Sequence, residues 1–349
     1  MLNAKTLRKL IVVTTICAVP VVLIAVKAGG SAIKNRHALF MPGLLKKPDQ
    51  IAKVVLQDSK RTLTLVKAGD VWQVGEKNNY PVLREKVEEL IYSLADLRVV
   101  EPKTSNKEYY KQLDVNDIAE ADSQAVLITI TDIYNDAIVK LYIGKREGIN
   151  LGEEYKENIF VRRANEDQAW LVQGVIPLSN DFRDWVEQPL LGIIESDQIK
   201  RVEIDKNKAG KVTITKEKQE QEDFSLTNVV LKKDMVLDLD AVNTVPFEMA
   251  ELEFNDVRPA SNNLDWNNGI TATLETFPGV KVVLNMIKDG DKVLAKVQAN
   301  ASEASKPELQ QKVLSFNQAK SAWVYELSPD IYKELALSND DFLKPKDVE

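Results

Sequence analysis

One pattern of residues occurs twice along this chain of 349 residues, and the duplication limits the possible fold more than any other feature. Ile51-Ala-Lys-Val-Val-Leu is matched by Ile199-Lys-Arg-Val-Glu-Ile, and both alternate apolar and polar residues as half-buried strands do. Five further matching pairs follow in the same order: Leu63 and Val212, Asp70 and Asp223, Leu97 and Val257, Ala125 and Gly269, and Ala169 and Ala322. Six matches in one order predict two copies, at about 51–190 and 198–335.

The order of patterns within each copy predicts an α+β fold. Each copy has two strands, a short strand, a helix, and then a set of strands that pair mostly antiparallel, with the helix packed on one face of the sheet. We therefore predict a first α+β repeat at 51–197 and a second at 198–349.

The helix of the first copy has the clearer pattern. Pro81 stands near its start, where a missing N–H costs little. Its apolar residues fall on one helical face: Leu83, Val87, Leu90, Ile91, Leu94 and Leu97. In the second copy Pro246 interrupts the corresponding stretch, so we expect a shorter helix that begins after Thr244.

A structured element is also predicted between the copies. Ser179 or Asn180 could cap a helix whose apolar side carries Phe182, Trp185 and Val186, and Pro189 would end or kink it.

The N-terminus carries an uncharged hydrophobic segment. Residues 1–9 form a basic start, Leu10–Val26 has 17 residues without a charge, and 27–50 reads as a linker rich in Gly and Pro. Three interpretations of Leu10–Val26 are open: a retained transmembrane signal anchor, a signal peptide cleaved near Ala28, and a buried core helix. The position behind a basic cluster favours the anchor.

The charge distribution excludes some partners. The first 36 residues hold six Lys or Arg and no acid, which leaves 40 basic and 53 acidic residues in the remainder. A body this acidic lacks the basic footprint that nucleic-acid binding needs. The single cysteine, Cys17, lies in the hydrophobic segment. We expect a single-pass membrane protein with its body outside the cytoplasm, because short anchors with a basic start commonly export the rest of the chain.

Several common chemistries are excluded by residue type. His37 is the only histidine and lies in the predicted linker, so Ser-His-Asp or Cys-His hydrolases and zinc sites built on Cys and His are not expected. No phosphate-binding P-loop and no G-x-G-x-x-G motif occurs. We predict no catalytic, cofactor-binding or metal-binding residue, no cofactor, and no enzymatic activity.

A mechanism that uses only carboxylates stays open, because two facing acids suffice for a glycosidase. Asp238-Leu-Asp240 is interpreted as a strand with one wet face. Asn262–Gly269 is rich in oxygen ligands and could hold calcium, but such clusters are primarily turn formers. For Trp72, Trp170 and Trp323, which recur at strand positions, core packing is favoured over carbohydrate stacking.

A succession of short motifs runs through the chain: Ile51-x-x-Val-x-Leu, Trp72-Gln-Val, Leu94-Ala-Asp-Leu-Arg-Val-Val, Leu141-Tyr-Ile-Gly, and Phe182-Arg-Asp-Trp with the Leu-Leu and Asp-Gln-Ile that come after it. In these motifs the chain resembles a bacterial family of unknown function whose members are anchored by one N-terminal helix and contain this repeat. The similarity spans about 10–335, and its motifs are structural. It implies a single-pass protein of the bacterial inner membrane with its body in the periplasm or otherwise outside the cytoplasm. It also implies a gene beside that of an ABC-type transporter of the gliding-motility kind, and it offers no catalytic residues.

These observations lead to one functional expectation and two alternatives. We expect a non-enzymatic, membrane-anchored extracytoplasmic accessory or scaffold protein of a membrane complex, with ABC transporter subunits as partners. The alternatives are a cell-envelope polysaccharide-binding protein or carboxylate-dependent enzyme, and a structural spacer.

Overall fold

The computed structural model describes residues 37–151, 154–207, 210–227, 229–261 and 263–346. The predicted basic start, the hydrophobic segment Leu10–Val26 and the first part of the predicted linker lie outside the described residues. Within the described ranges, no helix has the length and apolar character that crossing a membrane requires. The described chain forms two compact units, the first holding 37–72 and Arg84–Asp181, the second holding Gln73–Leu83 and the residues from Phe182 onward.

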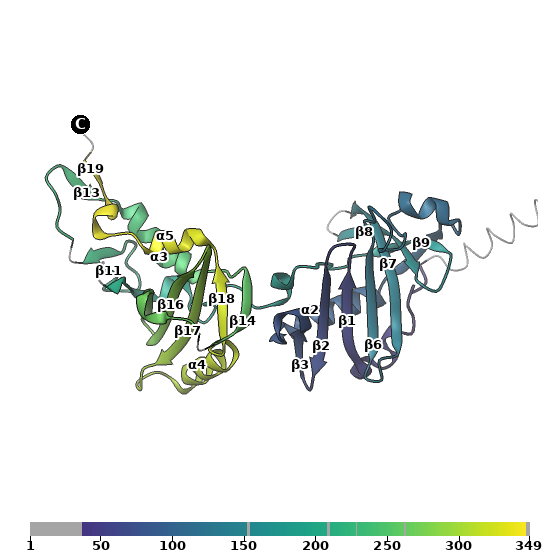
Figure 1. Ribbon diagram of the computed structural model, residues 1–349, viewed down its shortest axis with the longest axis horizontal. Coiled ribbons are helices and arrows are strands. Elements are labelled where there is room, and N and C mark those ends of the chain that lie inside the picture. The colour runs from purple at the N-terminus through teal and green to yellow at the C-terminus, as the bar shows by residue number, and fades with distance from the viewer. Residues whose placement is uncertain (1–36, 152–153, 208–209, 228, 262, 347–349) are drawn as a thin grey trace, which may run out of the picture. The chain divides into compact units, whose positions relative to one another are not determined.

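The first sheet has the strand order β4-β3-β2-β1-β6-β7-β8-β9-β5 (Figure 1). Alternating apolar residues bury one side of these strands, as in β1, where Ile51, Val54 and Leu56 are buried. The strands are β1 (Ile51–Gln57), β2 (Thr62–Ala68), β3 (Val71–Val74), β4 (Tyr80–Pro81), β5 (Arg98–Pro102), β6 (Val126–Asp132), β7 (Ala137–Leu151), β8 (Glu154–Arg163) and β9 (Ala169–Gly174).

The second sheet has the order β12-β11-β10-β15-β16-β17-β18-β14, which is the order of the first sheet without a counterpart of β4. The predicted α+β class with mostly antiparallel sheets is confirmed. The strands are β10 (Ile199–Asp205), β11 (Lys211–Thr215), β12 (Ser225–Thr227), β14 (Asp256–Pro259), β15 (Ile270–Thr276), β16 (Val280–Asp289), β17 (Lys292–Ala301) and β18 (Trp323–Leu327), and β13 (Met235–Leu237) pairs separately with β19 (Leu343–Pro345).

The two sheets also share details of register. The pairing of β1 with β6 shifts just after Ile51, and that of β10 with β15 shifts just after Ile199, so both repeats have an irregularity at the same place. At the opposite edge Pro102 faces Trp170 in the first sheet, and Pro259 faces Trp323 in the second. A shared order and a shared irregularity are what two copies of one unit would have.

A segment before the first strand of each sheet packs against its own unit. We call residues 37–50 the strap, or first strap, and residues 188–198 the second strap. The N–H of Phe40 donates to the carbonyl oxygen of Leu97 at 2.7 Å, and the N–H of Leu190 donates to that of Leu252 at 2.7 Å. Phe40 and Leu190 are both buried. Residues 37–50 were expected in the linker, but they belong to the first unit, and their first residues, 37–40, hydrogen-bond along β5 and Leu97 just before it.

The helix α2 (Arg84–Ala95) forms where its periodicity predicts, with Val87, Leu90, Ile91 and Leu94 buried. The expectation for the second copy was wrong, because α3 (Leu239–Ala250) runs through Pro246 without ending. Proline removes one helical hydrogen bond, but α3 buries Val242, Val245, Pro246 and Met249, and this packing outweighs the loss.

The stretch Asp238–Asp240 was also wrongly expected to be a strand. The strand β13 ends at Leu237, Asp238 is the N-cap of α3, and Asp240 lies in the first helical turn. An acid at the positive end of a helix is favoured electrostatically, which explains the preference for a helix start here.

Between the copies the predicted helix is a single 3-10 turn, Phe182–Trp185. Phe182, Trp185 and Val186 are buried, as expected for its apolar side. Ser179 Oγ accepts from the N–H of Asp181 at 3.1 Å, so it closes a local turn before Phe182. The segment therefore buries the predicted apolar side chains, but its helical part is shorter than predicted.

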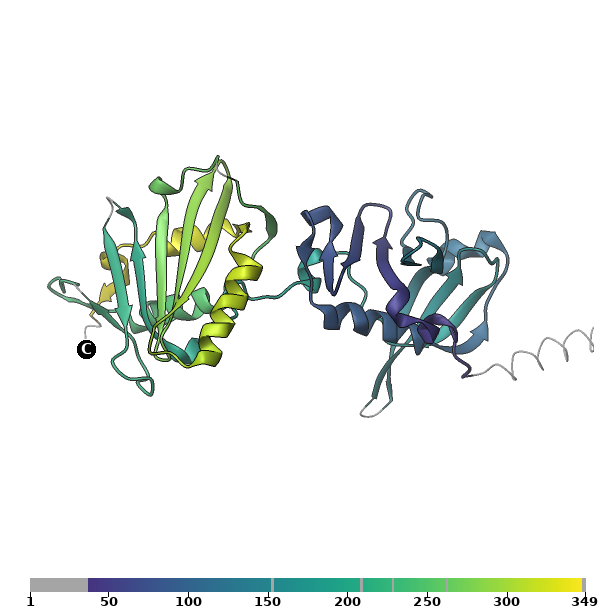
Figure 2. The same cartoon turned by 90° about the horizontal axis from the view of Figure 1, so that it is seen from below.

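Two further helices belong to the second unit. The helix α4 (Pro307–Lys320) connects β17 to β18 and packs alongside β17 (yellow-green in Figure 2), and α5 (Pro329–Leu335) follows β18. In the first unit the connection from β8 to β9 is a short turn over 164–168 and holds no helix.

Candidate functional site

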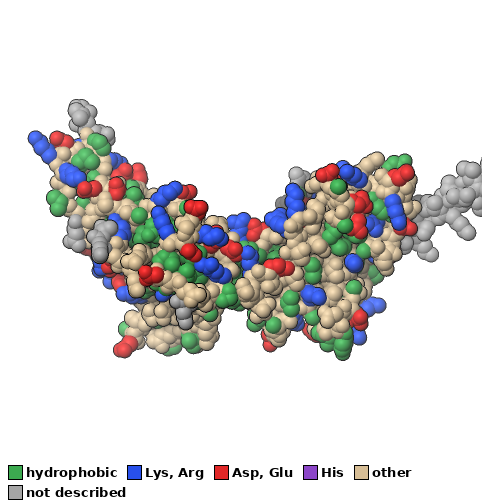
Figure 3. Space-filling model, viewed as in Figure 1, with side chains coloured by type: hydrophobic (Ala, Val, Ile, Leu, Met, Phe, Trp, Pro, Cys, Tyr) green, Lys and Arg blue, Asp and Glu red, His purple; other side chains and the backbone are tan. Residues whose placement is uncertain are grey.

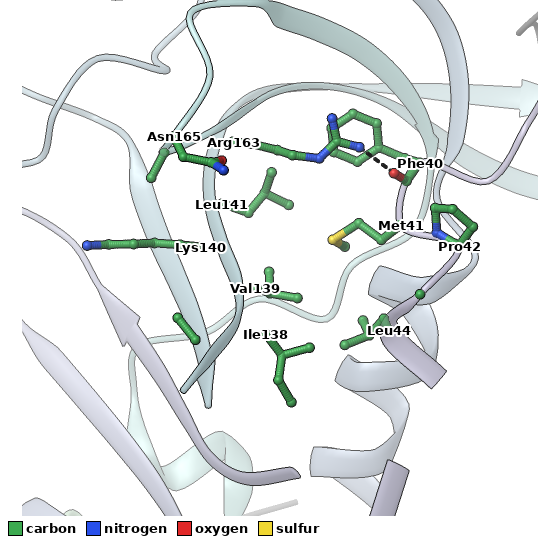
Figure 4. Close-up of a pocket in the computed structure, with 13 residues that line it drawn as sticks. Phe40, Met41, Pro42, Leu44, Ile138, Val139, Lys140, Leu141, Arg163 and Asn165 are labelled. Carbon is green, nitrogen blue, oxygen red and sulfur yellow. Dashed lines mark hydrogen bonds between the residues drawn. The ribbon is translucent and has the colours of Figure 1, made fainter. Parts of the chain in front are cut away.

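The first unit contains an open groove that is a candidate binding site (Figure 4). It has a volume of about 670 Å³. Three segments line it: Phe40–Leu44 of the strap, Ala137–Leu141 of β7, and Arg163–Asn165 at the end of β8.

The walls of the groove are apolar because of how these segments fold. Val139 and Leu141 alternate with Lys140 along β7, so in Figure 4 Lys140 extends in a different direction from the two apolar side chains. On the other wall, Met41 and Leu44 reach toward β7 from the strap. The groove is therefore a strip of apolar surface between a strand and the strap.

Arg163 fastens the strap to the sheet at one end of the groove. Its Nη2 donates to the carbonyl oxygen of Phe40 at 2.5 Å, and its guanidinium carbon lies 4.0 Å from the centre of the Phe40 ring. Its Nη1 also pairs with Glu166 at 3.0 Å. Because Arg163 is held by both neighbours, it shapes the groove and its charge is already compensated.

The charge at the rim is therefore set by Lys140. Among the described residues its ammonium has no ion-pair partner, and no carboxylate is found among the residues that line the groove. The groove is apolar inside and positive at one side of its rim.

Apolar side chains continue beyond the groove onto the surface. Ile138 on β7 is 39% exposed, and the turn that joins β6 to β7 exposes Ile133 (57%) and Tyr134 (72%). Ile133 donates its N–H to the carbonyl oxygen of Gln50, so this turn lies against the end of the strap. Figure 3 shows hydrophobic side chains at this end of the first unit. Exposed apolar surface beside a groove is typical of a binding surface for another molecule.

A second cluster is a pair of carboxyl groups in the second unit. Glu334 on α5 is hydrogen-bonded to Glu248 on α3, and burial together with this neighbour raises the pKa of Glu334 to about 7. The two carboxyls of a glycosidase stand roughly 5–9.5 Å apart so that a sugar or water fits between them. A directly hydrogen-bonded pair leaves no such space, so we interpret it as a contact between two helices.

The other residues considered from the sequence have structural roles. Asp265 accepts hydrogen bonds from the N–H of Asn267 and from Nδ2 of Asn268, so its carboxylate closes the local turn; Asn262 lies outside the described residues. His37 is exposed at the start of the strap. Across the described part of the chain, no group of three or more His, Cys, Asp or Glu side chains is arranged to hold a metal ion.

The tryptophans follow the core interpretation in part. Trp72 is buried, whereas Trp170 and Trp323 are half-buried on β9 and β18, where they pair with Pro102 and Pro259 of the edge strands.

The groove was not predicted from the sequence. Its strap wall was assigned to the linker, although Leu39-Phe40-Met41-Pro42-Gly43-Leu44-Leu45 is an apolar run that a free linker would not carry. That run is the signal that could have indicated it.

Comparison with known families gives one match. Residues 72–266, more than half of the chain, match the family described as Domain of unknown function (DUF4340). The chain belongs to the DUF4340 family. The matched range begins in β3 and ends just before β15, so it contains residues of both sheets. No curated protein and no solved structure matches the chain.

Proposed function

We propose that this DUF4340 protein is a non-enzymatic accessory or scaffold subunit of a membrane complex, anchored by Leu10–Val26 with its body outside the cytoplasm. An ABC-type transport system is the first candidate for that complex. The observation that carries the proposal is the apolar groove, with exposed Ile133, Tyr134 and Ile138 beside it. Apolar surface of this kind is enriched where proteins bind partners.

The position of the groove along the chain supports a partner in the same membrane. Only residues 27–36 separate Val26 from the strap at His37. Even fully extended, a chain of this length reaches about 40 Å at ~3.6 Å per residue. A groove tethered this closely would meet the extracytoplasmic parts of other membrane proteins far more often than free proteins.

Co-purification of the full chain tests the proposal. The chain would be extracted from its native membrane in a mild detergent through a C-terminal tag and analysed by mass spectrometry. We expect transmembrane subunits of one complex to be recovered with it. The matched control is residues 1–36 fused to an unrelated soluble protein, which should recover none of them. Recovery of the full chain only as a free monomer, while other transporters stay assembled, would contradict the proposal.

A further inference from the structure

The groove of the first unit has a counterpart position in the second unit, and the two straps establish the correspondence. The N–H of Leu44 donates to the carbonyl oxygen of Met41, and the N–H of Ile194 donates to that of Leu191. Phe40 and Leu190 also make matching backbone hydrogen bonds. Residues 40–44 of the first strap therefore correspond to residues 190–194 of the second strap.

Strand register gives the other wall of the counterpart position. Val139 pairs with Ile130 in the first sheet, and Val282 pairs with Leu274 in the second. In the first sheet Arg163 of β8 pairs with Leu141 of β7, and in the second sheet Val297 of β17 pairs with Leu284 of β16. The end of β8 at Arg163–Asn165 therefore corresponds to Val297–Ala299 of β17.

In the second unit this position is next to a helix that the chain itself supplies. Asn317 of α4 accepts from the N–H of Ala299 at 2.8 Å and donates to its carbonyl oxygen at 2.7 Å. Val313 and Phe316 on the inner side of α4 are buried. Phe316 and Ile193 line a pocket of about 700 Å³ between α4 and the second strap. The helix α4 thus packs on β17, on the side that faces the second strap.

The first unit has no helix at the corresponding place. Its β8–β9 connection is too short to form one, and the surface that α4 covers in the second unit is the open groove. One repeat therefore contains a helix where the other repeat has an apolar groove.

We infer that the groove of the first unit binds an amphipathic helix from a transmembrane partner, in the manner in which the second unit holds α4. This inference rests on the proposed function and names the kind of partner segment. The apolar side of the helix contacts Met41, Pro42 and Ile138, which line the groove and are at least partly exposed, and a carboxylate of the helix pairs with Lys140 at the rim. Helix-in-groove binding of this type uses apolar residues spaced by three or four positions, as Val313 and Phe316 are in α4.

Site-specific photocrosslinking in native membranes tests the inference. A benzoylphenylalanine would replace Ile138 in the full-length anchored chain, and the same residue would replace Tyr109, which is 49% exposed in the first unit outside the groove, as the matched control. We expect the Ile138 position to crosslink at least about tenfold more than the control, to one amphipathic segment of a membrane protein. Adding Lys140→Glu should lower that yield about fivefold, because it reverses the rim charge.

The remaining outcomes separate this inference from the proposed function. A crosslink to a second copy of this chain, or to lipid alone, overturns the helix-in-groove inference. Equal crosslinking yields at Ile138 and Tyr109, while the complex still co-purifies, also overturn the helix-in-groove inference. In that case the accessory role is retained, and the partner binds a different surface. Equal yields without co-purification overturn both.

Discussion

At the scale of single residues, the contact between Glu334 and Glu248 makes the second unit sensitive to pH. The pKa of Glu334 is raised to about 7, mainly by burial and then by the neighbouring carboxyl. A raised pKa means that the folded state binds the proton more tightly than the unfolded state. The protonated Glu334 therefore contributes its full stabilisation of the folded state at pH values below about 4.5, the pKa of this carboxyl in the unfolded chain. This stabilisation is lost as the pH rises through about 7.

The variant Glu334→Gln should remove this pH dependence, since an amide keeps the hydrogen bond without a charge. At pH 8 we expect it to raise the free energy of unfolding by on the order of 1 kcal/mol, allowing for solvent screening, and to leave it nearly unchanged at pH 4.5. Urea unfolding at several pH values measures this. The control Glu253→Gln, at an exposed position, should leave the free energy of unfolding unchanged at both pH values. Equal effects of Glu334→Gln at both pH values would show that the two carboxyls do not share a proton.

At the scale of secondary-structure elements, the sequence predicts what local patterns determine. The strands at Ile51 and Ile199 and the helix α2 follow from alternation and helical periodicity within a few residues. The strap was missed because the burial of Phe40 depends on Leu97 and Arg163, which lie far away in sequence. The length of α3 was missed for a similar reason, because only tertiary packing offsets the cost of Pro246. The groove needs strap and sheet together, so no local pattern contains it.

The attachment of α4 to β17 can be tested with Asn317→Ala. The substitution removes both hydrogen bonds to Ala299, whose backbone is buried and would be left without these partners. We expect the free energy of unfolding of the second unit to fall by about 2–4 kcal/mol, because unsatisfied buried polar groups are costly. Urea denaturation measures it. Gln318→Ala, on the exposed side of the same helix, should change stability by less than about 0.5 kcal/mol. A similar small effect for both variants would mean that α4 is held by its apolar side alone.

At the scale of the whole molecule, the two units do not follow the two sequence copies. Residues Gln73–Leu83 come from the first copy but belong to the second unit. Tyr80 packs there in a cluster of rings, with its centroid 4.9 Å from Trp323, 6.0 Å from Phe254 and 6.3 Å from Tyr325. Burial and the Tyr80 hydroxyl raise the pKa of Tyr325 above its ordinary range, so that group stays neutral and hydrogen-bonded. A segment of one copy therefore completes the core of the unit that contains the other.

The substitution Tyr80→Ala should consequently destabilise the second unit, although residue 80 lies in the first copy. Removing a buried aromatic ring from such a cluster costs about 3–5 kcal/mol. Hydrogen exchange measured by mass spectrometry should show faster exchange in β18 and in 252–259, with β1 and β6 of the first unit unchanged. Tyr92→Ala on α2, where the side chain is 56% exposed, is the control and should leave all of these segments as they are. If Tyr80→Ala instead sped exchange only in β1 and β6, residues Gln73–Leu83 would belong to the first unit. The two sequence copies would then fold as two independent domains, since neither would supply part of the other's core.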